Sequence, residues 1–117
     1  MKEVTRMENV KVVSTMSNKL ANRIRKALNK AIKDFQNSPE NYKTIGRKLY
    51  DKIERLELAF YDENEGNGEL DDHMYGPVGE LFDEVKRYTE DMEEEVEITK
   101  AIQAMKNLDT YIVENFI

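Results

Sequence analysis

The chain has 117 residues, no cysteine and a formal net charge of −6. This length suits a single domain, and the lack of cysteine excludes disulfides and thiolate metal sites, which is typical of a reducing compartment. No apolar run approaches the length of a membrane span, and the charged first fifteen residues do not resemble a secretory signal. These features predict a soluble, cytoplasmic protein.

The net charge conceals a strong asymmetry along the chain. Residues 1–38 carry nine Lys or Arg against three Asp or Glu, residues 39–62 carry five of each, and residues 63–117 carry four bases and sixteen acids. A basic first helix packed beside acidic last helices would lower the self-repulsion of each. The alternative is a surface that recruits a charged partner.

The N-terminal segment, residues 1–14, contains Val10, Val12 and Val13, which favour a strand by residue type, but no partner strand is evident. It is expected to form an extended arm or an extra helical turn.

The first helix is predicted from Ser17 to Gln36, with Ser17 as its N-cap. Apolar residues at steps of three and four lie on one face of it, namely Met16, Leu20, Ile24, Ala27, Leu28, Ala31 and Phe35.

Ser38 and Pro39 predict the start of a second helix, with Ser38 as the N-cap and Pro39 at the first helical position. Its end is expected near Asp62–Glu65, ahead of two glycines. Residues 63–76 would then form one long acidic loop. The apolar seam of this helix is typical of a bundle and consists of Tyr42, Ile45, Leu49, Ile53, Leu56 and Phe60.

A third helix is predicted to open at Pro77. Its apolar stripe is Val78, Leu81, Val85, Tyr88, Met92 and Val96, and a further stripe is Ile98, Ile102, Met105, Leu108, Ile112 and Phe116. At about 100° per residue the two stripes point about 160° apart, which exceeds the drift of one continuous helix. A turn near Glu94–Glu97 therefore favours an all-α antiparallel bundle of four helices in one domain, residues 1–117. The alternative is three helices with a long C-terminal helix that packs on a second copy as a homodimer.

The acidic loop invites comparison with a calcium-binding EF-hand. With Glu63 as position 1, Asn67 and Asp71 fall at acceptable positions. Position 12 is Met74, however, where calcium requires a bidentate carboxylate. His73 is the only histidine, and the sequence has no phosphate-binding glycine loop or nucleophile with a base. We therefore expect no metal, no cofactor and no catalytic site, so the chain is not predicted to be an enzyme.

A basic stripe follows the first helix at steps of 4-3-4-3 and consists of Lys19, Arg23, Lys26, Lys30 and Lys33. Such a stripe would attract the phosphates of a nucleic acid. The chain as a whole is acidic, however, and no aromatic residues interleave to stack on bases. The stripe is therefore interpreted as a solvated face, and nucleic-acid binding is kept as the alternative function.

Two further features predict binding to another protein. An aromatic patch on the flank or back of the second helix consists of Tyr50, Leu58 and Tyr61. Aromatic residues anchor interfaces, although the same residues would serve equally to widen the buried face. An acidic run consists of Glu90, Asp91, Glu93, Glu94, Glu95 and Glu97. The sequence therefore predicts a small acidic adaptor, regulator or inhibitor that binds a protein through these residues.

Overall fold

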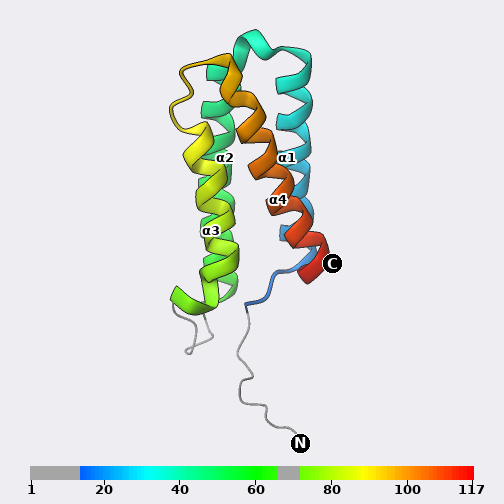
Figure 1. Cartoon of the computed structure of the whole chain (residues 1–117). Coiled ribbons are helices and arrows are strands. Elements are labelled where there is room, and N and C mark those ends of the chain that lie inside the picture. The colour runs from blue at the N-terminus through cyan, green and yellow to red at the C-terminus, as the bar shows by residue number, and fades with distance from the viewer. Residues whose placement is uncertain (1–13, 66–71) are drawn as a thin grey trace, which may run out of the picture.

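The computed structural model describes residues 14–65 and 72–117 of the chain. These segments form four α-helices: α1 (Asn18–Asn37), α2 (Tyr42–Glu63), α3 (Asp72–Thr89) and α4 (Ile98–Phe116) (Figure 1). Two short 3-10 turns, η1 (Pro39–Asn41) and η2 (Glu95–Glu97), precede α2 and α4. Successive helices run in opposite directions, each contacts the next, and α1 also contacts α4. The antiparallel four-helix bundle is therefore confirmed, and the predicted turn near Glu94–Glu97 replaces the alternative of one long C-terminal helix.

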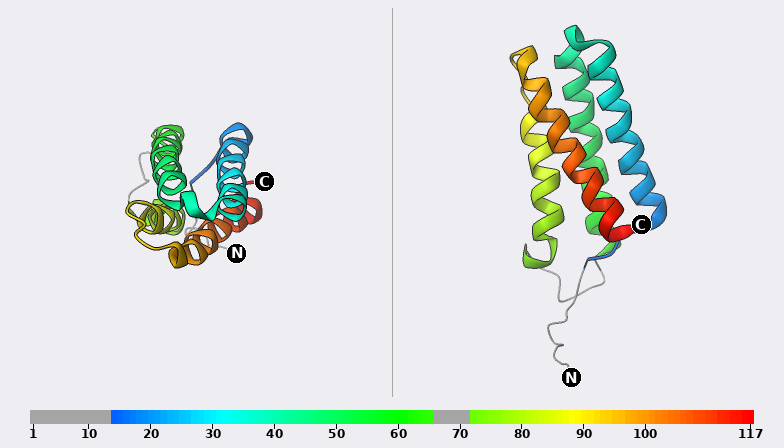
Figure 2. Two further views of the ribbon diagram at one scale, coloured as in Figure 1. Left: turned by 90° about the horizontal axis from the view of Figure 1, so that it is seen from above. Right: turned by 45° about the vertical axis from the view of Figure 1, so that its right-hand side comes forward.

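The four helices stand at the corners of the bundle when it is viewed along its axis (Figure 2). Their apolar faces meet in one core, and every residue of the stripes predicted for the first, second and last helices is buried or packs against it. The largest fully buried side chains include Phe35, Phe60, Phe82, Ile24, Leu28, Ile53, Leu56, Met105, Leu108 and Ile112. The core thus draws on all four helices.

The stripe predicted for the third helix needs two corrections. Phe82 is fully buried, although the predicted stripe omitted it. Val96 is wrong as a core residue, because 72% of it is exposed. The helix ends at Thr89 and the chain turns before η2, so the helical spacing that linked Val96 to Met92 no longer applies.

The start of α3 also differs from the prediction. The helix begins at Asp72, with Pro77 inside it, so residues 72–76 are helical and the predicted loop 63–76 is shorter. Proline inside a helix removes one backbone hydrogen bond but does not forbid the helix, and an acidic residue type is favourable at a helix start. The candidate calcium ligands Asn67 and Asp71 lie outside the described residues, as do residues 1–13 of the predicted arm.

Ser38 joins α1 to η1 with its backbone, and its side chain makes no capping hydrogen bond. The Ser38 N–H donates to the carbonyl oxygen of Asp34 at 2.8 Å, and its own carbonyl accepts the N–H of Asn41 at 2.9 Å. The predicted side-chain cap is therefore wrong, and α2 begins at Tyr42. Pro39 occupies the first position of η1 and disfavours a helical conformation at Ser38, which separates the two helices.

Ser17 caps α1 as predicted, because its Oγ accepts the N–H of Leu20 at 3.1 Å. The carboxylate of Glu63, at the end of α2, accepts the N–H of Ser17 at 2.8 Å and its hydroxyl at 2.6 Å. Next to it, the buried Asn64 side chain accepts the N–H of Thr15 and donates to its carbonyl, each at 2.9 Å. The last turn of α2 therefore holds the chain that enters α1, with a negative charge at the positive end of the α1 dipole.

Ser17→Ala is expected to lower the free energy of unfolding by about 0.5–2 kcal/mol, because the variant loses the cap of α1. Chemical denaturation measures this loss. Ser38→Ala is the matched control: its side chain caps nothing, so its stability should stay within about 0.5 kcal/mol of the parent protein. Equal losses in the two variants would contradict the assignment of the caps.

The second helix approaches the end of α3 closely at Gly46. A Cβ atom at this position would lie 2.7 Å from Sδ of Met92 and 3.0 Å from the carbonyl oxygen of Thr89. The thioether can move aside, but the carbonyl moves only with the end of α3. The absent side chain thus allows the buried Met92 to pack against α2.

Candidate partner-binding surfaces

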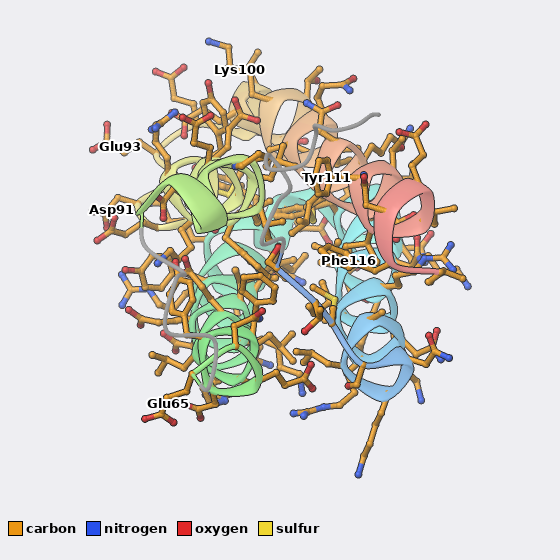
Figure 3. The ribbon with its side chains drawn as sticks, turned by 90° about the horizontal axis from the view of Figure 1, so that it is seen from below. Glu65, Asp91, Glu93, Lys100, Tyr111 and Phe116 are labelled. Atoms are coloured by element: carbon orange, nitrogen blue, oxygen red, sulfur yellow. The ribbon has the colours of Figure 1, made fainter. Side chains whose placement is uncertain are left out.

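The segment that joins α3 to α4, residues 90–97, is called the acidic turn below. It lies at the end of the bundle that also holds η1 (Figure 1). The side chains of Asp91 and Glu93 project away from the helices (Figure 3). Among the six predicted acidic residues of this segment, Glu97 is half-buried and the others are exposed. The structure therefore brings the predicted acidic residues together on one accessible turn.

Contacts with α2 hold the backbone of the acidic turn. The hydroxyl of Tyr42 donates to the carbonyl oxygen of Glu93 at 2.9 Å. The guanidinium of Arg47 donates to the carbonyl oxygen of Glu90 at 3.4 Å and lies 3.6 Å from the carboxylate of Asp91. The other carboxylates of the turn form no ion pair with a cation in the described part of the chain, so they keep their charge available to a partner.

Val96 lies in the acidic turn, in the 3-10 segment η2. It is the most exposed of the large hydrophobic residues that the structure describes, at 72%. The prediction from helical spacing assigned it to the core and so missed it as a surface residue. Its neighbours in sequence give no signal of this exposure, because Met92 is also flanked by two acidic residues and is nevertheless buried.

The three residues of the predicted aromatic patch lie in different surroundings. Leu58 is 58% exposed and Tyr50 is half-buried. Tyr61 packs against the core, with its ring centroid 5.8 Å from that of Phe60. Tyr61 therefore widens the buried face of α2, which was the second interpretation of the patch. Tyr50 and Leu58 remain accessible on α2.

Tyr50 lies within the electric field of the acidic turn. The negative charges of Glu54 and then Glu90 raise the pKa of Tyr50 above its ordinary value, which itself lies well above neutral pH. Leu58 is eight residues further along α2, which corresponds to about 12 Å along the helix axis. Tyr50 is therefore the member of the predicted patch that borders the acidic turn.

Comparisons with models of known families, with curated proteins and with solved structures found no match for this chain. Within the described segments, no helix has the length and apolar character needed to cross a membrane. No group of three or more potential metal-ligating side chains occurs among these residues. His73 belongs to α3 by its backbone.

The basic stripe of α1 remains in solvent, as all five of its residues are exposed. In the part of the chain that the structure describes, Lys30 alone of these five forms an ion pair, at 2.7 Å from Asp34 of the same helix. The ion pair between α1 and α4 instead uses Arg25, whose Nε lies 2.8 Å from a carboxylate oxygen of Asp109 on α4. Charge compensation between α1 and α4 thus leaves the stripe free.

An ion pair with little exposure joins α2 to α3 beneath these surfaces. Nζ of Lys86 lies 2.8 Å from Oε1 of Glu57, and Oε2 of Glu57 accepts the hydroxyl of Tyr61 at 2.8 Å. Burial acts to lower the pKa of Lys86, but the hydrogen bond and charge of Glu57 outweigh it and raise this pKa overall. The ion pair fixes α3 to the side of α2 on which Tyr61 lies.

Proposed function

We propose that this protein is a small acidic adaptor, regulator or inhibitor of the cytoplasm that acts by binding another protein through the acidic turn. The observation that carries the proposal is Val96, an apolar residue that is 72% exposed between carboxylates on a turn held to α2. Protein interfaces combine apolar anchors with a polar, charged rim. The complementary partner would offer a shallow apolar pocket bordered by Lys or Arg.

The residues around Val96 have separable roles in this proposal. The carboxylates of Glu93, Glu94 and Glu95 would steer a basic partner, which acts mainly on the association rate. Tyr50 borders the turn and would add an aromatic contact with a hydrogen-bond donor. Leu58 would serve as a further anchor on the same helix, and Tyr61 would support this flank from its half-buried position against the core.

The triple variant Glu93→Lys, Glu94→Lys and Glu95→Lys is expected to slow association with the partner by about tenfold or more at low salt. The deficit should shrink as salt rises, because screening removes the charge effect. The partner is first captured from a lysate of the native cells and identified by mass spectrometry, and surface plasmon resonance then gives both rate constants.

Two further variants separate charge from contact. Val96→Asp should accelerate dissociation while circular dichroism shows an intact bundle, because Val96 is not part of the core. Reversal of Asp62, Glu80 and Glu114 to Lys makes the same change in net charge at exposed positions elsewhere and should slow association less. Unchanged kinetics in both the Val96 variant and the acidic-turn variant would refute the proposed surface.

A further inference from the structure

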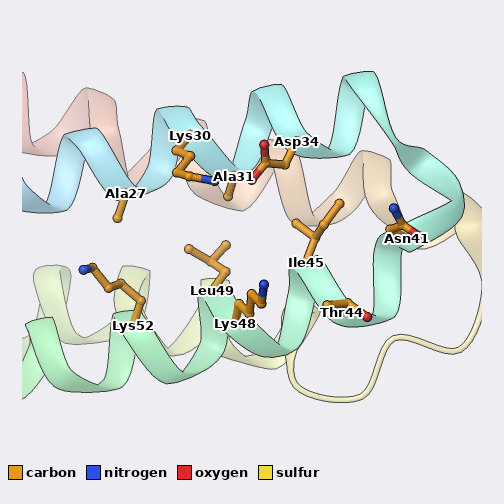
Figure 4. A pocket seen from close by; sticks show the side chains of 10 residues that line it. All are labelled: Ala27, Lys30, Ala31, Asp34, Asn41, Thr44, Ile45, Lys48, Leu49 and Lys52. Atoms are coloured by element: carbon orange, nitrogen blue, oxygen red, sulfur yellow. Dashed lines mark hydrogen bonds and ion pairs between the residues drawn. The ribbon is translucent and has the colours of Figure 1, made fainter.

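A groove of about 560 Å³ runs between α1 and α2. Ala27 and Ala31 of α1 point toward α2, and Ile45 and Leu49 of α2 point toward α1 (Figure 4). These four side chains form an apolar floor. The rim is polar and carries a net positive charge, with Lys30, Asp34, Asn41, Thr44, Lys48 and Lys52.

Residue size explains why the groove is present. Ala27 and Ala31 lie where α1 faces α2, and their methyl groups fill little of the space between the helices. Ile45 consequently remains half-buried, although it belongs to the apolar seam of α2. The outer part of the α1–α2 contact is therefore an apolar surface that no other described segment covers.

The charge of the rim determines which charge a bound partner segment should carry. Lys30 pairs with Asp34 at 2.7 Å, but no carboxylate among the described residues pairs with Lys48 or Lys52. The exposed basic stripe of α1 runs beside the same groove and adds to its positive potential. A complementary occupant is therefore apolar along one side and negatively charged along its edges.

We infer that the groove binds an acidic amphipathic helix of a partner protein. Such a helix places apolar residues at i, i+3, i+4 and i+7 into a groove between helices, and acidic residues on its flanks would reach Lys48 and Lys52. The α2 side of the groove extends from Thr44 to Lys52, which corresponds to about 12 Å of helix and accommodates these anchors. A small ligand fits less well, because ligand pockets bury most of their ligand whereas this groove is open to solvent along one side.

The N-terminal segment of this chain does not have the required chemistry. Residues 1–13 carry three bases and two acids, so their net charge has the same sign as that of the rim. The inference goes beyond the proposed function, because the groove and the acidic turn are separate surfaces of opposite charge. It holds even if the acidic turn binds nothing, and the two sets of variants distinguish the two failures.

The test uses the full chain and a labelled model helix of about 18 residues, with Leu at the four anchor positions and Glu on the flanks. Fluorescence anisotropy measures affinity, and NMR of the 15N-labelled protein locates the site. We expect saturable binding, with the largest amide shifts at Ala27, Ala31, Ile45 and Leu49. Lys48→Glu with Lys52→Glu should weaken binding at least tenfold, and Ala27→Phe should weaken it by filling the groove from a half-buried position.

The matched control is Lys100→Glu with Lys106→Glu, which makes the same charge change at exposed positions on α4. It should weaken binding less than threefold. The inference is overturned if the acidic helix does not bind, or if a helix with Lys in place of Glu binds equally well. It is also overturned if the parent protein binds a single-stranded oligonucleotide or oleate but not the acidic helix, and the groove variants lose that binding. Self-association through the groove, measured by sedimentation, would overturn it as well.

Discussion

Phe60→Ala is expected to lower the free energy of unfolding by about 3–5 kcal/mol, the range for removal of a buried aromatic side chain. Phe60 is fully buried. Its ring centroid lies 6.0 Å from that of Phe82 on α3 and 6.4 Å from that of Phe116 on α4. One truncation therefore removes contacts between three helices and leaves a cavity that surrounding side chains cannot fill without moving.

Urea denaturation followed by circular dichroism measures this loss. Leu58→Ala is the control, because this residue lies on the same helix and is 58% exposed. Its effect should be below about 1 kcal/mol. A loss of less than about 1 kcal/mol for Phe60→Ala as well would show that α2 does not pack against α3 and α4 as described.

Glu57→Ala is expected to cost about 3 kcal/mol, the lower end of the range for removing one partner of a buried ion pair. The side chain of Glu57 is 7% exposed and that of Lys86 is 21% exposed, so water compensates part of the loss at Lys86. The variant also removes the acceptor of the Tyr61 hydroxyl. Replacing both partners, as in Glu57→Leu with Lys86→Met, should recover most of the stability, because no buried charge is then left alone.

The pH dependence gives an independent check on this ion pair. The pKa of Lys86 is raised in the folded protein, so the pair stabilises fully below the ordinary lysine pKa and loses its contribution as pH rises through the folded value. The difference in unfolding free energy between the parent protein and Glu57→Ala should therefore be constant near neutral pH and shrink above about pH 10.4. A difference that stays constant up to pH 11 would contradict the coupling.

Periodicity was sufficient to predict most of the fold. The seams of the first, second and last helices follow the spacing of their apolar residues, and the change of phase near Glu94 indicates the last turn. Backbone details were less predictable. Ser38 has the residue type of an N-cap, but a 3-10 turn intervenes before α2, and Pro77 marked a helix start that lies within α3. Both errors arose from treating one residue type as a boundary signal when neighbouring backbone contacts decide the boundary.

The surfaces were predictable only where charge defines them. The residue types alone identify the acidic run of residues 90–97, whereas the exposure of Val96 depends on where α3 ends. The α1–α2 groove was hidden for another reason. Ala27, Ala31, Ile45 and Leu49 each appear as members of an apolar stripe, and nothing in one helix indicates that small residues on it face a half-covered isoleucine on the next.

The bare backbone at Gly46 links the interior of the bundle to the acidic turn. Its neighbours, the carbonyl of Thr89 and the side chain of Met92, come immediately before and within the segment that carries Glu93–Glu97. A methyl group added at this position would displace the thioether of Met92 and press on the carbonyl of Thr89, so we expect a small shift at the start of the acidic turn. Position 46 is therefore where natural variation or directed evolution can adjust the presentation of this surface while its chemistry stays constant.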